Sequence, residues 1–185
     1  MIEQTLVLLK PDAVTRGITG QIIQRFENTG LKIIGMKMVH IDKEFAEKHY
    51  PKDLIPILGN KTLADWEEMG IKSDKKAEEL GTQCHKQLIN YATESPIIAI
   101  VFEGVHAVMM VRKMVGHTSP HKANPGTIRA DFSTVSMGYC TTKGFGGRNL
   151  IHASGSVDEA KREIDLWFTP KELFEYSTVH EKHFR

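Results

Sequence analysis

Cysteine is scarce in this chain. Its two cysteines among 185 residues, Cys84 and Cys140, lie far apart and form no C-x-x-C motif. A small disulfide framework or a zinc ribbon needs more thiols at closer spacing. We interpret both as free thiols in a reducing compartment, with a single disulfide as the alternative that the spacing leaves open.

Long apolar runs are also missing. The longest, residues 96–102, has the length of a strand and is far too short to span a bilayer. The first four residues lack the basic region and the apolar stretch that are typical of a signal peptide. We therefore expect a cytoplasmic protein with no membrane partner.

Neither sign of charge is in excess, because 24 Lys and Arg residues balance 23 Asp and Glu residues to a formal net charge of +1. This balance provides no general attraction to nucleic acid or to an anionic membrane. A site for a phosphorylated ligand must therefore be a local cluster of basic side chains. The length and the 41% share of apolar residues predict one domain over residues 1–185 with a full core.

Apolar periodicity predicts short strands that alternate with helices. Strands are expected at residues 5–9, 31–41, 97–102 and 150–151. Helices are expected at residues 18–26, 44–50, 106–115 and 156–168, with two more on either side of Gly70, and loops at residues 116–127 and 132–148. Ser156 is the expected N-cap of the last helix, with Glu159 as its capping-box partner. This order predicts an α+β fold, a ferredoxin-like split βαβ sandwich in which helices cover one face of a four-stranded antiparallel sheet.

Two polar clusters are suited to phosphate. Lys10-Pro11-Asp12 ends a buried strand, where a lysine can be held rigidly as a point charge; a plain turn is the alternative. From Arg112 to residue 132, two arginines and two threonines surround a loop rich in Pro and Gly. Arginine forks and hydroxyls suit phosphate oxygens, although a solvated surface loop has the same composition.

A third cluster, residues 148–156, contains His152, and Glu163 follows in the next predicted helix. His152 comes after two apolar residues and before small ones, so we expect one face of its ring to be open. A structural or merely exposed histidine is the alternative.

In this order, the clusters closely resemble the nucleoside diphosphate kinase family, over nearly the whole chain outside two segments. The family pattern of Lys-Pro-Asp, then Arg-Gly, then Gly-x-Ile-Ile-x-Arg-Phe matches residues 10–12, 16–17 and 20–26. Gly-Thr-Ile-Arg-x-Asp-Phe matches residues 126–132, Arg-Asn-x-x-His-[Gly/Ala]-Ser matches residues 148–154, and Glu-Ile-x-x-Trp-Phe matches residues 163–168.

The resemblance implies an enzyme that transfers the γ-phosphoryl group of a nucleoside triphosphate to a nucleoside diphosphate, by a ping-pong mechanism through a phosphohistidine. It implies His152 as the nucleophile, Glu163 as the carboxylate that fixes the other ring nitrogen, and Ser154 as support for this pair. Tyr50 and Lys10 are expected at the transferred phosphate. The implied nucleotide contacts are Lys10, Arg112, Thr118 and Arg129 for the phosphates, and Lys10 and Asn149 for the ribose.

Mg²⁺ is the implied cofactor. In the family it bridges the nucleotide phosphates and has few protein ligands, so we expect no metal site built from protein side chains. Family members are homo-oligomers, either hexamers or tetramers, and the sequence does not choose between them.

The chain departs from the family pattern in three places. Insertions are expected at about residues 52–84 and 133–146. The first lies where the family has a phenylalanine that stacks on the base, and His85 is a weak substitute for that ring. Gly155 stands where the family usually has Asp, although the nucleophile and its glutamate remain and activity is still expected.

Two alternatives to an active kinase remain. The first is a nucleotide-binding protein of the same fold with weak catalysis, because of Gly155 and the missing phenylalanine. The second is a nucleic-acid-binding protein, whose signature of a basic stripe with interleaved aromatic residues is not found in this sequence.

Overall fold

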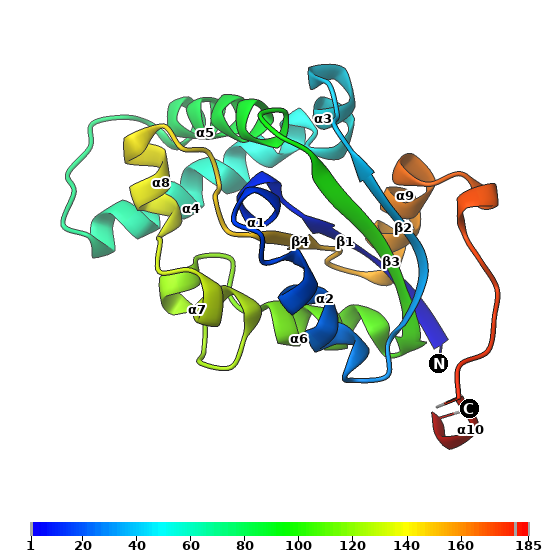
Figure 1. Ribbon diagram of the computed structural model, residues 1–185. Coiled ribbons are helices and arrows are strands. Elements are labelled where there is room, and N and C mark those ends of the chain that lie inside the picture. Colours follow the sequence, from blue (N-terminus) through cyan, green and yellow to red (C-terminus); the bar gives the residue numbers. More distant parts are fainter. Residues whose placement is uncertain (1, 180, 185) are drawn as a thin grey trace.

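The computed structural model describes residues 2–179 and 181–184. Within them, four strands form one antiparallel sheet in the order β2-β3-β1-β4 (Figure 1). This arrangement confirms the predicted α+β fold. The strands are β1 Ile2–Leu9, β2 Lys32–Val39, β3 Ile97–Val105 and β4 Ile151–Ala153.

The helices connect and cover these strands (Figure 1). They are α1 Pro11–Thr15, α2 Thr19–Glu27, α3 Lys43–His49, α4 Ile55–Glu68, α5 Ala77–Ala92, α6 Ala107–Val115, α7 Ile128–Phe132, α8 Met137–Lys143, α9 Val157–Trp167 and α10 Glu181–Phe184. Across the described residues, none of these helices is both long and apolar enough to cross a bilayer.

The sheet is covered on both faces, so the expectation of helices on one face is wrong. Leu6 and Leu8 of β1 pack into a core with residues of α3, α5 and α9. Val7 and Leu9 point the other way, into a second core with residues of α1, α2, α6 and α7. The continuous apolar run in β1 is the reason, since a strand with one solvated face would alternate apolar and polar residues.

The expected loop at residues 132–148 is also partly wrong, because it contains α8. Ser136 caps this helix by accepting a hydrogen bond from the Tyr139 N–H, and Gly144 ends it with φ 72°. A helix of seven residues is too short to show a convincing period in the sequence. Its position depends on contact with α4, where the Trp66 indole N–H donates to the Gly138 carbonyl at 3.0 Å.

The two helices expected around Gly70 are present as α4 and α5, and they cross at two glycines. A Cβ added at Gly59 would lie 1.8 Å from the Ala77 carbonyl oxygen, and one at Gly81 would lie 2.0 Å from that of Ile55. The helices therefore touch backbone to backbone. With α8 they form a group of three helices beyond one end of the sheet (Figure 1).

Candidate active site

A cavity of about 370 Å³ opens beside β4, within the range of small-ligand sites. Its charged lining includes four cationic side chains and one carboxylate, Glu159. Because the net charge of the chain is close to zero, a site for a phosphorylated ligand was expected to be a local cluster of basic side chains, and this cavity has such a cluster. The lining residues are Lys10, Lys61, Arg112, Val115, Gly116, His117, Thr118, Arg129, Asn149, Ile151, His152, Ala153, Gly155 and Glu159.

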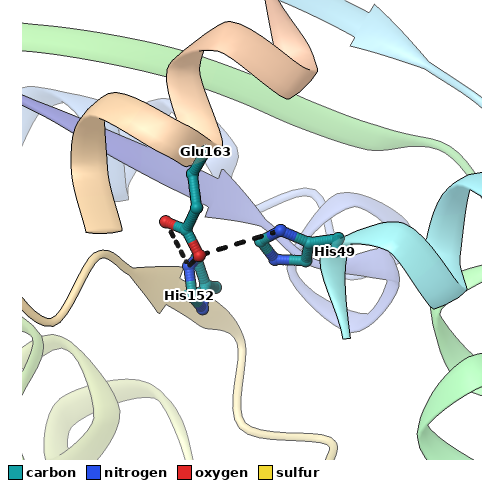
Figure 2. Close-up of side chains that lie close together, drawn as sticks. All are labelled: His49, His152 and Glu163. Atoms are coloured by element: carbon teal, nitrogen blue, oxygen red, sulfur yellow. Dashed lines mark hydrogen bonds and ion pairs between the residues drawn. The ribbon is translucent and has the colours of Figure 1, made fainter. Parts of the chain in front are cut away.

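His152 lies on β4, paired with Leu8 of the central strand β1. Its Nε2 atom lies 2.9 and 3.0 Å from the two carboxylate oxygens of Glu163 on α9 (Figure 2). An ionised carboxylate only accepts hydrogen bonds, so Nε2 carries a proton, and in the neutral ring the lone pair is on Nδ1. The His152 side chain is 19% exposed, which leaves the ring accessible from the cavity.

Glu163 is buried, and a buried carboxylate needs hydrogen-bond partners. The Ser154 hydroxyl donates to its Oε2 at 2.7 Å and accepts from the Leu6 backbone N–H at 3.2 Å. The carboxylate that orients His152 is therefore tied to the central strand. Of the residues that the resemblance implied, His152, Glu163 and Ser154 form one connected group.

His49, at the end of α3, belongs to the same group, and the sequence did not single it out. Its Nδ1 lies 3.8 Å from Glu163 Oε1 (Figure 2). The same Nδ1 accepts from the Trp167 indole N–H at 3.2 Å. Its ring meets that of His152 edge-on, with centroids 4.7 Å apart. His49 lies three positions after buried Ala46, on the same face of α3, so helical spacing is consistent with a buried histidine but does not reveal its neighbours.

Burial holds the pKa of His49 well below its ordinary value of about 6.5, with His152 and Lys10 lowering it further. Because the His49 ring is neutral, it does not compete with His152 for the negative charge of the Glu163 carboxylate. His49, His152 and Glu163 lie close enough to resemble a metal site. We do not interpret them as a metal site, because the Trp167 N–H already occupies the lone pair of His49 Nδ1. His49 instead packs beside the hydrogen-bonded pair of His152 and Glu163.

The first and third sequence clusters meet at Leu150, which is buried and has φ 71°. A left-handed backbone is costly for a residue other than glycine. The Asp12 carboxylate accepts from the Leu150 N–H at 3.1 Å, and the Lys10 N–H donates to the Leu150 carbonyl at 2.8 Å. The Lys-Pro-Asp turn therefore fixes the backbone two residues before His152.

The Lys10 side chain is buried beside the cavity, and its Nζ donates to Asn149 Oδ1 at 2.8 Å and to the Gly147 carbonyl at 3.4 Å. Burial, and then the nearby Arg129 charge, lower the pKa of Lys10 to about 8. Lys10 and Asn149, the two implied ribose contacts, are thus direct partners.

Arg129 connects three parts of the site. Its guanidinium donates to the carbonyls of Asn149 (3.2 Å), Gly116 (3.0 Å) and Ile151 (2.6 Å). Burial, followed by the neighbouring Arg112, lowers the pKa of Arg129 to about 10. Arg129 therefore brings a positive charge to the cavity while its donors hold the loop and β4 together. Arg112 and Thr118 are exposed at the same cavity.

Tyr50 and His85 are placed differently from their expected roles. Tyr50 is buried with its ring centroid 6.4 Å from that of His152, and it is not among the described residues that line the cavity. Burial and the Glu163 charge hold the pKa of its hydroxyl well above the usual value. His85 is buried and its Nε2 lies 2.7 Å from the Tyr50 carbonyl oxygen, so the suggestion that it replaces the base-stacking ring is wrong.

The expected capping box at the start of α9 is half correct. The Glu159 N–H donates to the Ser156 hydroxyl at 3.1 Å, but the Glu159 carboxylate accepts from the Gly155 N–H, at 2.6 Å, rather than from Ser156. A Cβ at Gly155 would lie 2.4 Å from that carboxylate. Glu159 thus brings a carboxylate to the position where the family's Asp is missing.

Comparison with known proteins agrees with this geometry. The family model for nucleoside diphosphate kinase matches residues 3–54 and 72–173. A nucleoside diphosphate kinase of Pyrobaculum aerophilum is 44% identical over 181 residues, which cover 94% of this chain and 99% of its own. One from Pyrococcus horikoshii is 48% identical over 175 residues, covering 94% and 90%.

Solved structures agree as well. An NDP kinase from Pyrobaculum aerophilum superposes with a TM-score of 0.87 at 42% identity, covering 95% of this chain and all of its own. A nucleoside-diphosphate kinase from Borrelia burgdorferi, a transition state mimic with bound vanadate and ADP, gives 0.83 at 37% identity, covering 99% and 96%. With its fold, its cationic cavity and its relatives in agreement, the chain belongs to the nucleoside diphosphate kinase family.

Proposed function

We propose that His152 Nδ1 is the atom that carries the phosphoryl group in the kinase reaction of this chain. The observation that supports this most strongly is the contact between Nε2 and both oxygens of buried Glu163. It fixes the tautomer, orients the ring, and directs the lone pair to the nitrogen that remains free. A catalytically weak nucleotide-binding protein is not favoured, because His152 and Glu163 lie in hydrogen-bond contact beside the cavity.

In the first half-reaction, the Nδ1 lone pair forms a bond to the γ-phosphorus of a nucleoside triphosphate. The bond from that phosphorus to the β–γ bridging oxygen breaks, and the nucleoside diphosphate leaves with the electron pair. Nε2 keeps its proton, and the Glu163 carboxylate balances the cationic ring. In the second half-reaction, a terminal oxygen of another nucleoside diphosphate attacks the phosphorus, and the N–P electron pair returns to Nδ1.

Positioning and charge supply the rest of the catalysis, since phosphoryl transfer needs little covalent help from the protein. In this proposal Lys10, Arg112 and Arg129 stabilise the negative charge on the phosphate oxygens. The Thr118 hydroxyl hydrogen-bonds to a phosphate, and Asn149 contacts the ribose while it orients Lys10. Tyr50 packs beside the His152 ring and does not contact the nucleotide.

Mg²⁺ fits this site as an ion that arrives with the nucleotide. Among the described lining residues Glu159 is the only carboxylate, and it already accepts from the Gly155 N–H. A cation held by the phosphates and by water suits such a cavity better than one held by a protein cage. When bound, Mg²⁺ would neutralise negative charge on the nucleotide phosphates.

We further propose that residues 1–185 act as one domain in the cytoplasm and assemble as a homo-oligomer, a hexamer or a tetramer. Both cysteines are buried and free, which suits a reducing compartment. Strand β2 is an edge of the sheet, and it exposes Met36 and Met38. Exposed apolar side chains on a sheet edge favour association with another copy.

Incubation with γ-labelled ATP and Mg²⁺ tests the central proposal. The wild-type protein should acquire an acid-labile, alkali-stable label that is chased by a nucleoside diphosphate, and His152→Ala should acquire none. His40→Ala, which removes an exposed histidine outside the site, should label like wild type. Removing divalent ions should abolish labelling of every variant.

Label that survives in His152→Ala would contradict the role of His152. Nucleotide binding without any label on the wild-type protein would instead support the catalytically weak alternative.

A further inference from the structure

Helix α4 is the part of the chain that the family match omits, since that match stops at residue 54 and resumes at residue 72. The helix nevertheless reaches the nucleotide cavity, because Lys61, in its middle, is one of the cavity's lining residues. An element outside the family pattern therefore adds a cation to the site proposed above.

The contacts of α4 show which side of the helix faces the nucleotide loop. Asp65 Oδ1 accepts from Lys122 at 2.9 Å, and its Oδ2 accepts from the Ser119 hydroxyl at 3.3 Å. Glu68 pairs with the same lysine at 2.7 Å. Both partners, Ser119 and Lys122, lie in the loop that follows the implied phosphate contact Thr118.

Lys61 lies four residues before Asp65, one helical turn away on the same side of α4. The Asp65 anchor therefore places Lys61 over the loop and at the edge of the cavity. Although burial alone would raise the pKa of Asp65, its hydrogen bonds from Lys122, the Gly138 N–H and Ser119 hold that pKa below the usual value. The anchor thus stays ionised and hydrogen-bonded at neutral pH.

The charge of Lys61 is available to a ligand. The side chain is exposed, and within residues 2–179 and 181–184 it forms no ion pair. By contrast, Lys122 is held by two carboxylates, and Lys10 and Arg129 already donate to protein oxygens. Four positive charges around one small cavity repel each other until an anion enters.

We propose that Lys61 binds the phosphate chain of the nucleotide, as a contact that the inserted helix α4 adds to the site. This inference rests on the proposed function, because it takes the cavity beside His152 as the nucleotide site. The helix has a double role: Asp65 and Glu68 hold the loop, and Lys61 contacts the ligand that the loop surrounds.

Calorimetric titration of the unphosphorylated protein tests this proposal without requiring catalysis. Lys61→Gln should weaken the binding of ADP and of inorganic tripolyphosphate by about 3- to 10-fold, the range for one partly exposed charge-assisted contact. AMP, with one phosphate, should lose less. Lys61→Arg should retain most of the affinity, and the loss should shrink as salt is added.

Lys86→Ala is the matched control, since it removes an exposed lysine of the neighbouring helix α5 that does not line the cavity. It should bind like wild type. Unchanged ADP and tripolyphosphate affinity in Lys61→Gln would overturn the proposal, and so would an equal loss for AMP and ADP, which would place Lys61 at the ribose or base. If the wild-type protein binds ADP but forms no phosphohistidine, the proposed function fails while the Lys61 test still gives a result.

Discussion

At the residue scale, the site depends on charged groups held out of water. Glu163 and Lys10 are both nearly buried, and each has protein partners that determine where its charge acts. The two groups have different tasks. Glu163 orients a nucleophile, whereas Lys10 is placed to bind an anionic ligand. Before the nucleotide binds, the hydrogen-bond partners of the Lys10 ammonium are neutral oxygens, so its positive charge is only partly balanced.

Lys10 should therefore impose an alkaline limit on the free enzyme. With its pKa lowered from 10.5 to about 8, Lys10 is cationic below pH 8 and neutral above it, so nucleotide capture should weaken as the pH rises through 8. Because kcat/KM reports groups of the free enzyme, its value at pH 9 should be about 10-fold below that at pH 7. A pH profile of kcat/KM for ATP, the nucleotide that meets the unphosphorylated enzyme in the first half-reaction, measures this.

Lys10→Arg provides the comparison, because a guanidinium keeps its charge across this range. Its overall rate should be lower, since the fork does not reproduce the contact with Asn149, but its alkaline limb should move to higher pH. If kcat/KM fell over the same alkaline pH range in both proteins, a group other than Lys10 would be responsible for the fall.

At the scale of elements, the insertion is built around close backbone contact. The two glycine crossings let α4 lie directly on α5, and α8 then packs on α4 through Trp66 and Gly138. The predicted insertions at residues 52–84 and 133–146 thus meet each other in space. Together they hold the loop that carries Thr118 at the edge of the cavity.

Gly59→Ala should disturb this packing, because the new Cβ would meet the Ala77 carbonyl oxygen at 1.8 Å. Backbone cannot yield as a flexible side chain does, so we expect a loss of about 1–3 kcal/mol in the free energy of unfolding. Urea denaturation measures it. ADP affinity should fall too, since α4 carries Lys61 and the Asp65 anchor.

Gly20→Ala is the matched control, since Gly20 lies in α2 with nothing within 4 Å of the added Cβ. There the change should stabilise by about 0.5–1 kcal/mol, because alanine is the better helix former. A stable Gly59→Ala protein with normal ADP affinity would show that the crossing tolerates more separation than we infer.

At the scale of the whole molecule, the proposed homo-oligomer should form at the edge strand β2. The outer side of β2 is partly covered by the C-terminal segment, where the Phe174 N–H donates to the Ile34 carbonyl at 2.7 Å. Met36 and Met38 remain 56% and 59% exposed beside it. This apolar edge is the surface on which we expect a second copy to pack.

Met36→Glu combined with Met38→Glu should shift the protein toward smaller species, because association would bury two charges without partners. Analytical ultracentrifugation at several concentrations measures the shift. Tyr139→Glu, on α8 away from β2 (Figure 1), should leave the assembly unchanged. A monomeric wild-type protein, or an oligomer that tolerates the double change, would contradict the proposed interface.

Local patterns in the sequence determined much of this protein. The apolar run of β1, the amphipathic spacing of α9 and the glycine between α4 and α5 helped to predict most strands and helices, because period and turn chemistry act over a few residues. The order of the polar clusters predicted the family, and with it His152 and Glu163.

Tertiary structure alone decided the rest. It placed His49 against Glu163, buried His85, formed α8 from a stretch with no period, and brought Lys61 to the cavity. Each of these depends on contact between segments far apart in the chain. A short-range pattern does not encode such contacts, because they follow from how whole elements pack.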